Sequence, residues 1–317
     1  MPTLTIGNRT ARLPIIQGGM AVRISLAPLA TAVANAGGIG IIAGSGLELD
    51  EMASQVRTAR AATSGIFGVN VMVAGRAFPE LVKTAMREGA DLVIAGAGFS
   101  RDVFQWGRDA DVPIVPIVGS PRVAKLAEKF GASAVVVEGF EAGGHLGTDR
   151  YMLDLLPEII EAVDIPVIGA GGVVTGGDIK HVLDMGAAGV QMGSRFATTQ
   201  ESSAPQAFKE MYLDATDEDV ILIKSPVGLP GRALRSPFTD LLASGQKPDM
   251  GRCRSCLKAC HKDYCIIERL ERSQRGDVET GLIFAGASAA RIHDIPSVAE
   301  LMQRLVAEWQ AATEGAA

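Results

Sequence analysis

PVIGAGGVVTGGDIKHVLDMGAAGVQMG, residues 166–193, holds two short apolar runs on either side of a helical pattern. The first run, PVIGAG (166–171), and the second, AGVQMG (188–193), are apolar almost throughout, as expected of strands buried on both faces. Between them, TGGDIKHVLDMG has helical spacing and ends in Gly186, a common helix stop. The stretch therefore predicts a strand–helix–strand unit of a parallel sheet.

Six further apolar runs precede this unit at fairly even intervals: LPIIQ (13–17), GIGIIA (38–43), IFGVNV (66–71), DLVIAG (91–96), PIVPIV (113–118) and SAVVVE (133–138). Helical patterns such as SLAPLATAVANAG, PELVKTAMREGA and SPRVAKLAEKFGA separate them. Eight alternations of strand and helix predict a (β/α)8 TIM barrel of the α/β class. A doubly wound open sheet is the alternative, but the GGMA after the first run is not the G-x-G-x-x-G fingerprint that such a sheet would carry.

The eighth run ends near residue 194, and one barrel helix cannot use all of the chain that follows. Residues 201–279 are more polar and contain several prolines and all the cysteines. Residues 280–317 return to apolar helical spacing, with Ser297 as the predicted N-cap of the last helix. We therefore predict a barrel formed by residues 1–200 and 280–317, with a small lid domain, residues 201–279, inserted after strand eight.

The composition limits the classes of function. Hydrophobic residues make up 47% of the chain and charged residues 21%, which is typical of a globular protein. The net charge of −6 disfavours nucleic acid or an anionic membrane as a partner. The N-terminus lacks a signal-peptide pattern, and no run approaches the roughly 18 apolar residues of a membrane span. We expect a cytoplasmic enzyme, and leave open whether it is a monomer or a homodimer.

Functional residues of a barrel are expected where the strands end and the following loops begin. Glycines after strands seven and eight let backbone N–H groups converge on one anion, at the usual phosphate site of a barrel. The alternative is that these glycines only make tight turns. The candidates at the strand ends are Gly18, Gly19, Met20 and Ala21 after strand one, Asn70 in strand three, Glu138 and Gly144 at and after the end of strand six, Gly171 and Gly172 after strand seven, and Gly193 and Ser194 after strand eight.

His145 lies among glycines in GGHLG (143–147), the loop after strand six. The other three histidines lie in polar stretches of the sequence. A histidine at this strand end is a candidate acid, base or hydrogen-bond donor. Glu138 is a candidate partner of His145 or of a cofactor's polar atoms, and a simple strand-end charge is an equally good interpretation.

Five motifs occur in an order that resembles one known family: PIIQGGMA (14–21), AGGIGIIAGSG (36–46), EGFEAGGHLG (138–147), IPVIGAGGV (165–173) and VQMGSRF (190–196). Together they resemble the nitronate monooxygenase family, formerly the 2-nitropropane dioxygenases. That family also includes FMN-dependent enoyl-acyl-carrier-protein reductase II enzymes and some NADH:quinone reductases. The resemblance covers residues 10 to about 205 closely and the C-terminal segment more loosely.

The resemblance implies that FMN lies across the barrel mouth. Its phosphate would rest on Gly171, Gly172, Gly193 and Ser194, and its ring would pack over Gly18, Met20 and Ala21, with Asn70 and Gly144 nearby. It also implies that Lys125 lies near the flavin, where a cation stabilises an anionic reduced flavin. Without the family, Lys125 would be interpreted as an exposed helix charge.

The resemblance makes His145 the catalytic residue. In the leading hypothesis the enzyme oxidises alkyl nitronates with O2 to a carbonyl compound and nitrite, and His145 is a base or a donor to the nitro oxygens. The alternative is an NAD(P)H-dependent enoyl-acyl-carrier-protein reductase or related flavin reductase, in which His145 polarises the thioester carbonyl. A third reading is a non-catalytic barrel that binds FMN or a phosphosugar. The segment 201–279 is expected to cover the substrate side and encode specificity.

Four cysteines form a C-x2-C-x3-C-x4-C pattern in the inserted segment: Cys253, Cys256, Cys260 and Cys265. This spacing brings four sulfurs within reach of one zinc ion or one [4Fe–4S] cluster. Reduced structural cysteines and a redox-active pair are the open alternatives. Many members of the family lack these cysteines, so the resemblance does not imply them. We predict a metal site that stabilises an inserted domain with little core of its own.

Overall fold

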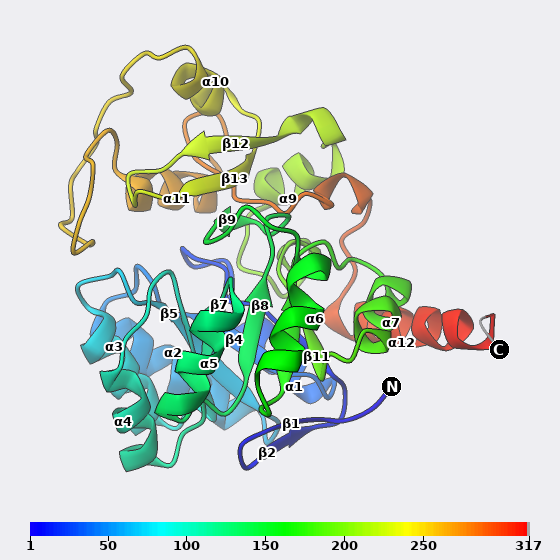
Figure 1. Cartoon of the computed structure of the whole chain (residues 1–317). Coiled ribbons are helices and arrows are strands. Elements are labelled where there is room, and N and C mark those ends of the chain that lie inside the picture. The colour runs from blue at the N-terminus through cyan, green and yellow to red at the C-terminus, as the bar shows by residue number, and fades with distance from the viewer. Residues whose placement is uncertain (316–317) are drawn as a thin grey trace.

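Eight parallel strands close into a barrel in the computed structural model, which describes residues 1–315 (Figure 1). Strands that follow one another in the chain are neighbours in the barrel, and the first strand also pairs with the last. A bridge between Ile16 and Ile39 joins the first strand to the second and closes the barrel. The barrel strands are β3 (Ile15–Gln17), β4 (Gly40–Ala43), β5 (Phe67–Met72), β6 (Leu92–Gly96), β7 (Ile114–Val118), β8 (Val135–Glu138), β10 (Val167–Ala170) and β11 (Gly189–Met192). Each predicted apolar run overlaps one of them, so the prediction of a TIM barrel is confirmed.

A ring of helices covers the outside of the barrel. The last helix packs against α7 and α1 and so closes the ring after the long excursion of the chain. Its N-cap is Ser297, as predicted, whose hydroxyl accepts from the backbone N–H of Glu300 in a capping box. The ring consists of α1 (Ala27–Asn35), α2 (Leu49–Ala62), α3 (Phe78–Glu88), α4 (Asp102–Ala110), α5 (Pro121–Phe130), α6 (Met152–Ala162), α7 (Gly176–Asp184) and α12 (Val298–Glu314).

Apolar side chains fill the barrel interior, and an N-terminal hairpin closes one end. The hairpin, β1 (Leu4–Ile6) with β2 (Arg9–Ala11), contributes Leu4 and Ile6 to the interior cluster that also contains Ile16 and Ile39. The sequence analysis did not anticipate this hairpin. Because the hairpin covers the amino ends of the strands, the open end of the barrel is the carboxyl end, where barrel active sites form.

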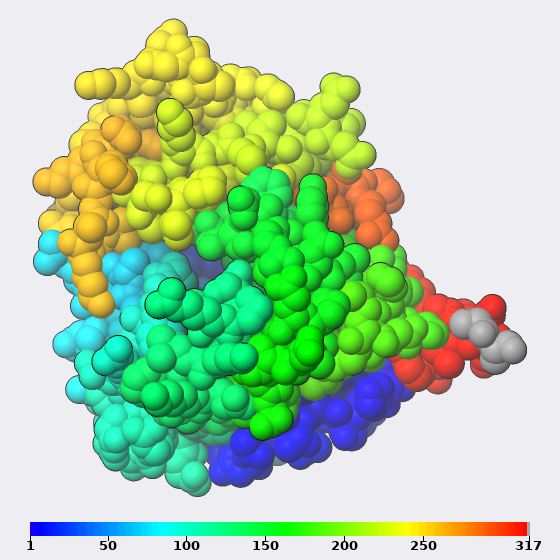
Figure 2. Space-filling view, in the orientation of Figure 1, coloured from blue at the N-terminus to red at the C-terminus, as the bar shows by residue number. Residues whose placement is uncertain are grey.

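The chain between β11 and α12 lies over this open end, as the yellow and orange segments of Figure 1 show. A short strand, β9 (Gly144–His145), pairs with the inserted strand β13 and ties the β8 loop to the insertion. In Figure 2 the surface is hollowed where the insertion meets the barrel. The elements of this part are α8 (Ser194–Ala197), α9 (Gln206–Leu213), η1 (Asp217–Asp219), β12 (Val220–Lys224), β13 (Pro230–Leu234), α10 (Pro237–Ala243), α11 (Ile266–Gln274) and η2 (Ala289–Arg291).

Within residues 1–315, no helix is both long and apolar enough to cross a membrane. The boundaries predicted for the inserted lid, residues 201–279, remain a prediction.

Candidate functional site

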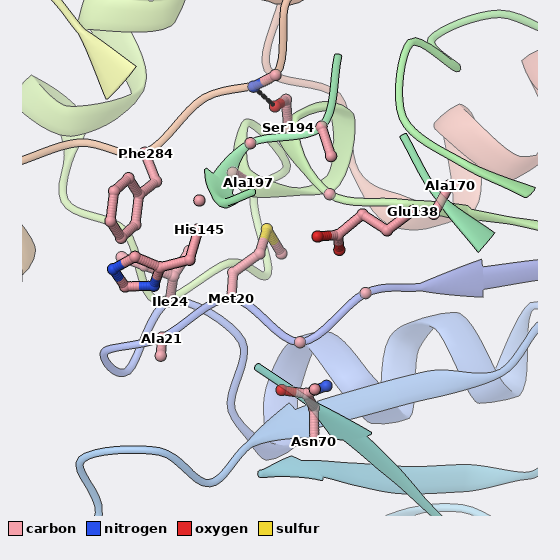
Figure 3. A pocket seen from close by; sticks show the side chains of 18 of the residues that line it. Met20, Ala21, Ile24, Asn70, Glu138, His145, Ala170, Ser194, Ala197 and Phe284 are labelled. Atoms are coloured by element: carbon pink, nitrogen blue, oxygen red, sulfur yellow. Dashed lines mark hydrogen bonds between the residues drawn. The ribbon is translucent and has the colours of Figure 1, made fainter. Parts of the chain in front are cut away.

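A cavity of about 260 Å³ lies at the carboxyl ends of the strands, beneath the insertion. Barrel loops form its floor, and the insertion forms its roof (Figure 3). Twelve of the predicted residues line it together: Gly18, Gly19, Met20, Ala21, Asn70, Glu138, Gly144, His145, Gly171, Gly172, Gly193 and Ser194. The structure therefore gathers residues from strands one, three, six, seven and eight around one space.

The glycines after β10 and β11 leave backbone exposed on one side of the cavity. Gly171 and Gly172 have φ angles of +113° and +73°, which favour glycine. A Cβ built on Gly193 would meet no atom within 4 Å, so this position borders open space. The Ser194 hydroxyl accepts a hydrogen bond of 2.9 Å from the backbone N–H of Gly286 (Figure 3). A third segment, at Gly286, thus completes the cradle.

The loop after β3 forms the floor of the cavity. Gly19 passes so close to Asn70 that a Cβ there would lie 2.4 Å from the Asn70 Cβ. Only glycine fits this approach. The backbone N–H of Met20 donates to the Ser25 hydroxyl at 2.9 Å, which holds the loop against the start of α1. Met20 and Ala21 therefore present a fixed apolar surface to the cavity (Figure 3).

His145 lies on β9, where its backbone pairs with Gly231 of the insertion. Its Nε2 lies 2.7 Å from the hydroxyl of Ser225, also in the insertion. The edge of the Phe284 ring packs against the imidazole, with the ring centroids 5.0 Å apart. Burial without a nearby counter-charge lowers the pKa of His145 to about 4, so the imidazole is neutral at physiological pH.

Two polar side chains of the barrel, Glu138 and Gln191, line the cavity and have no hydrogen-bond partner within residues 1–315. Protein atoms surround the Glu138 carboxyl, and its remaining exposed surface faces the cavity (Figure 3). Burial raises its pKa to about 7. The Oε1 atom of Gln191, in β11, is buried and accepts no hydrogen bond within residues 1–315. Because buried polar groups are almost always paired, both side chains point to a polar ligand.

Lys125 lies elsewhere. It is exposed on α5 and does not line the cavity. The helix turns this side chain outward because Ala124 and Ala127 occupy the inward face. The structure thus gives no support to the expectation, carried by the resemblance alone, that Lys125 approaches a flavin.

The four cysteines of the insertion form no disulfide in the structure. Within residues 1–315, no group of three or more His, Cys, Asp or Glu side chains is arranged to hold a metal ion. Cys253 and Cys260 are exposed, Cys256 is half-buried, and Cys265 packs into an apolar cluster of the insertion. The four thiols are free of disulfides, and zinc or a [4Fe–4S] cluster at these residues stays a prediction.

Several residues that line the cavity were missed in the sequence. Gln191 interrupts an otherwise apolar run, and this polar residue inside a buried strand was the available signal. Phe284 and the apolar face of α11 gave no signal, because nothing in residues 201–290 indicates which helix face meets the barrel. Ser225 follows the strand β12 and resembles any loop serine.

Comparison with known proteins assigns the family. The family model described as nitronate monooxygenase matches residues 3–84 and 74–308. This chain belongs to the nitronate monooxygenase family. Its relatives in that family are oxidoreductases, and so is this protein. The non-catalytic reading is therefore not supported.

Three proteins that are similar to this chain carry names of different activities. The chain is 31% identical to (3aS,4S,5R,7aS)-5-hydroxy-7a-methyl-1-oxo-octahydro-1H-indene-4-carboxyl-CoA dehydrogenase of Mycobacterium tuberculosis, over 92% of both chains. The structure of FabK from Thermotoga maritima superposes with a TM-score of 0.87, at 30% identity, and covers 96% of this chain and 95% of FabK. Nitroalkane oxidase from Streptomyces ansochromogenes gives a TM-score of 0.83, at 27% identity, and the match covers 97% and 98% of the two chains.

Proposed function

We propose that this protein is an FMN-dependent oxidoreductase that acts on a thioester with an apolar acyl group. The observation that carries the substrate class is the roof of the cavity. Apolar side chains of α11 and the segment after it face the site: Ile266, Ile267, Leu270, Leu282 and Phe284. A small nitronate would leave this wall without a partner, whereas an acyl chain or ring would cover it.

The residues present fit FMN. Gly171, Gly172, Gly193 and Ser194 would hold the phosphate, since all four line the cavity and Gly193 borders open space. Gly18, Met20, Ala21 and Asn70 would support the ring, with Gly144 beside it. The unpaired Gln191 and Glu138 side chains offer an acceptor and, while protonated, a donor for the polar atoms of the cofactor. FMN, when bound, supplies the centre that gives or takes a hydride.

His145 handles the proton in this proposal. Its imidazole is neutral and lines the cavity next to Ala21 (Figure 3). A neutral imidazole can take a proton from the carbon next to the thioester carbonyl in the direction of oxidation. In the direction of reduction, its ring donates a hydrogen bond to the carbonyl. The insertion lies over the barrel mouth (Figure 1), where it would limit the access of water to this exchange.

The name of the mycobacterial relative supports a coenzyme A thioester, because that protein is a dehydrogenase of a carboxyl-CoA. Nitronate oxidation with O2 is the second candidate. It is favoured by the description of the family model and by the similarity to a nitroalkane oxidase. In that reaction His145 would bind the nitro oxygens of a much smaller substrate.

The experiment that decides is anaerobic stopped-flow mixing of the purified protein with four probes in parallel: butyryl-CoA, NADH, NADPH and ethyl nitronate. We expect an oxidised-flavin spectrum that bleaches with butyryl-CoA or with a nicotinamide, and in the latter case reoxidises with crotonyl-CoA. Bleaching by the nitronate alone would replace the proposal with nitronate oxidation. A protein that turns over without flavin would remove both.

A further inference from the structure

The chain returns from the insertion to the barrel through residues 282–289, LIFAGASA, here named the return segment. The Leu234 N–H of β13 donates to the Ile283 carbonyl at 2.9 Å, and the Ala285 N–H donates back to β13 at 3.2 Å. Because an extended chain points successive side chains to opposite faces, Ile283 and Ala285 pack into an apolar cluster while their neighbours face the cavity. The residues of the segment that line the cavity are Leu282, Phe284, Gly286, Ser288 and Ala289.

Two hydrogen bonds fix the second half of the return segment against the cradle formed by the loops after β10 and β11. The Gly286 N–H donates to the Ser194 hydroxyl at 2.9 Å (Figure 3). The Ala287 N–H donates to the backbone carbonyl of Glu141, in the loop after β8, at 2.8 Å. The backbone that leads into Ser288 is therefore held in place.

Ser288 is the one polar side chain among residues 282–289, and it lines the cavity. A Cβ built on Gly172, in the loop after β10, would lie 3.9 Å from the Ser288 Oγ atom. The Ser288 hydroxyl does not cap the turn that follows it and makes no hydrogen bond within residues 1–315. Its hydrogen is therefore available to a ligand that accepts hydrogen bonds next to Gly172.

We propose that Ser288 is a ligand of the FMN phosphate and closes the cradle from the side of the return segment. The inference rests on the proposed function, because it takes FMN as the cofactor. Backbone N–H groups after β10 and β11 serve the phosphate from the barrel, and the Ser288 hydroxyl serves it from the segment that leads out of the insertion. A hydrogen bond to a phosphate oxygen is charge-assisted and stronger than a bond between neutral groups.

The return segment also carries Phe284, whose ring edge packs against His145 with the ring centroids 5.0 Å apart. The Phe284 carbonyl accepts a hydrogen bond from the buried hydroxyl of Tyr212. A phosphate that holds Ser288 thus also holds the segment that places Phe284 on the imidazole. The phosphate end of the cofactor then steadies the wall beside His145, and it fastens the insertion to the barrel.

A comparison of FMN with riboflavin tests the phosphate contact, because riboflavin is the same flavin without the phosphate. Flavin-free protein is titrated with each compound, and quenching of flavin fluorescence gives two dissociation constants. Ser288→Ala should raise the constant for FMN about tenfold and leave the constant for riboflavin within about twofold. Ser288→Thr keeps a hydroxyl and should restore most of the affinity for FMN. Ser288→Asp adds a like charge and should weaken FMN binding further, again without an effect on riboflavin.

Ser244→Ala is the matched control, since Ser244 is an exposed serine that does not line the cavity, and both of its constants should equal those of the wild type. Thermal unfolding of each flavin-free variant establishes that the fold is retained. An unchanged constant for FMN in Ser288→Ala, or an equal loss of affinity for FMN and riboflavin, would overturn the inference. A wild-type protein that binds neither flavin would overturn the proposed function, and the inference with it.

Hydrogen exchange measured by mass spectrometry gives a second readout, which does not depend on activity. FMN should slow the exchange of amides in the return segment more than riboflavin does, because only FMN engages Ser288. This difference between the two flavins should shrink in Ser288→Ala and remain in Ser244→Ala. Equal protection by FMN and riboflavin in the wild type would show that the phosphate does not hold the segment.

Discussion

Burial shifts the pKa values of two ionisable residues of the cavity, His145 and Glu138, in opposite directions. Burial disfavours the charged form of each, so the pKa of His145 falls to about 4 and the pKa of Glu138 rises to about 7. Between these values both side chains are uncharged. A cavity lined by uncharged side chains suits a planar flavin ring and an acyl group, because binding either of them would not remove water from a charged group.

Glu138→Gln should make FMN binding independent of pH. In the wild type the carboxyl is neutral below about pH 7 and charged above it, and the charged form faces both burial and the negative phosphate of FMN. The bound state thus holds the proton more tightly than the free chain, so affinity is full at low pH and falls as pH rises, by up to about tenfold per unit. Flavin fluorescence titrations from pH 5.5 to 9 measure this.

The glutamine variant keeps the shape and a donor, so its affinity should match that of the wild type at pH 6. If both proteins lose affinity equally between pH 7 and 9, Glu138 does not contact the cofactor.

Gly193→Ala should weaken FMN binding without weakening the fold. The φ angle of Gly193 is −104°, which alanine tolerates, and a Cβ there would meet no protein atom within 4 Å. The added methyl group would instead occupy space that we assign to the phosphate. We expect a loss of affinity of about tenfold or more, with a change in unfolding free energy below about 0.5 kcal/mol. Equilibrium dialysis and thermal melting give the two numbers.

Gly177→Ala in α7 is the matched control, because it lies outside the cavity and its Cβ has room. Unaltered FMN affinity in Gly193→Ala would place the phosphate elsewhere.

At the scale of elements, a buried carboxylate joins the floor of the cavity to its roof. Glu271 of α11 is almost fully buried and pairs with Arg23, after the loop of Met20 and Ala21, at 3.0 Å. It also pairs with Arg254 of the cysteine segment at 2.6 Å. Arg23 reaches Glu51 of α2 as well, at 2.7 Å. One carboxylate thus fastens α11, the β3–α1 loop and residues 251–262 to one another.

Glu271→Gln should destabilise the protein by about 2 kcal/mol, because it leaves arginines without their buried counter-charge. This cost is lower than for a fully buried ion pair, because the three arginines that pair with Glu271, namely Arg23, Arg254 and Arg275, are all partly exposed. Glu268→Gln, which breaks an i,i+4 pair with Arg272, is the control and should cost about 0.5 kcal/mol. Urea denaturation measures both, and equal midpoints for the two variants would show that Glu271 is not a fastening point.

The elements differ in how far the sequence predicted them. The eight strands were predictable because apolar runs buried on both faces alternate with amphipathic helices, and glycines at their ends marked the floor of the site. β9 was not, because two residues have no periodicity and pair only with a strand some 85 positions away. Lys125 and the cysteines show the limit of a motif position or a spacing: both are one-dimensional, and the helix face and the loop path decide where the side chain points.

At the scale of the whole molecule, the insertion shares its apolar clusters with loops of the barrel, although the chain order suggests a barrel with an added lid. Val22 of the β3–α1 loop packs in one apolar cluster with Phe238, Tyr264 and Leu270 of the insertion. Ile24 of the same loop joins a second cluster with Phe208 and Tyr212. Because the apolar clusters of the insertion within residues 1–315 both include barrel loops, the insertion should not persist without the barrel.

A probe in the barrel and a probe in the insertion should therefore report the same unfolding transition. Both tryptophans, Trp106 and Trp309, lie on barrel helices α4 and α12, so tryptophan fluorescence reports the barrel. Cys265 is buried in the insertion, so its reaction with a pulse of thiol reagent, followed by peptide mass spectrometry, reports the insertion. We expect the two midpoints in urea to coincide.

Cys260, exposed in the same domain, should react at every urea concentration and serves as the internal control. Labelling of Cys265 at lower urea than the fluorescence change would mean that the insertion opens on its own, and that the contact between Ser225 and His145 is made and broken with it.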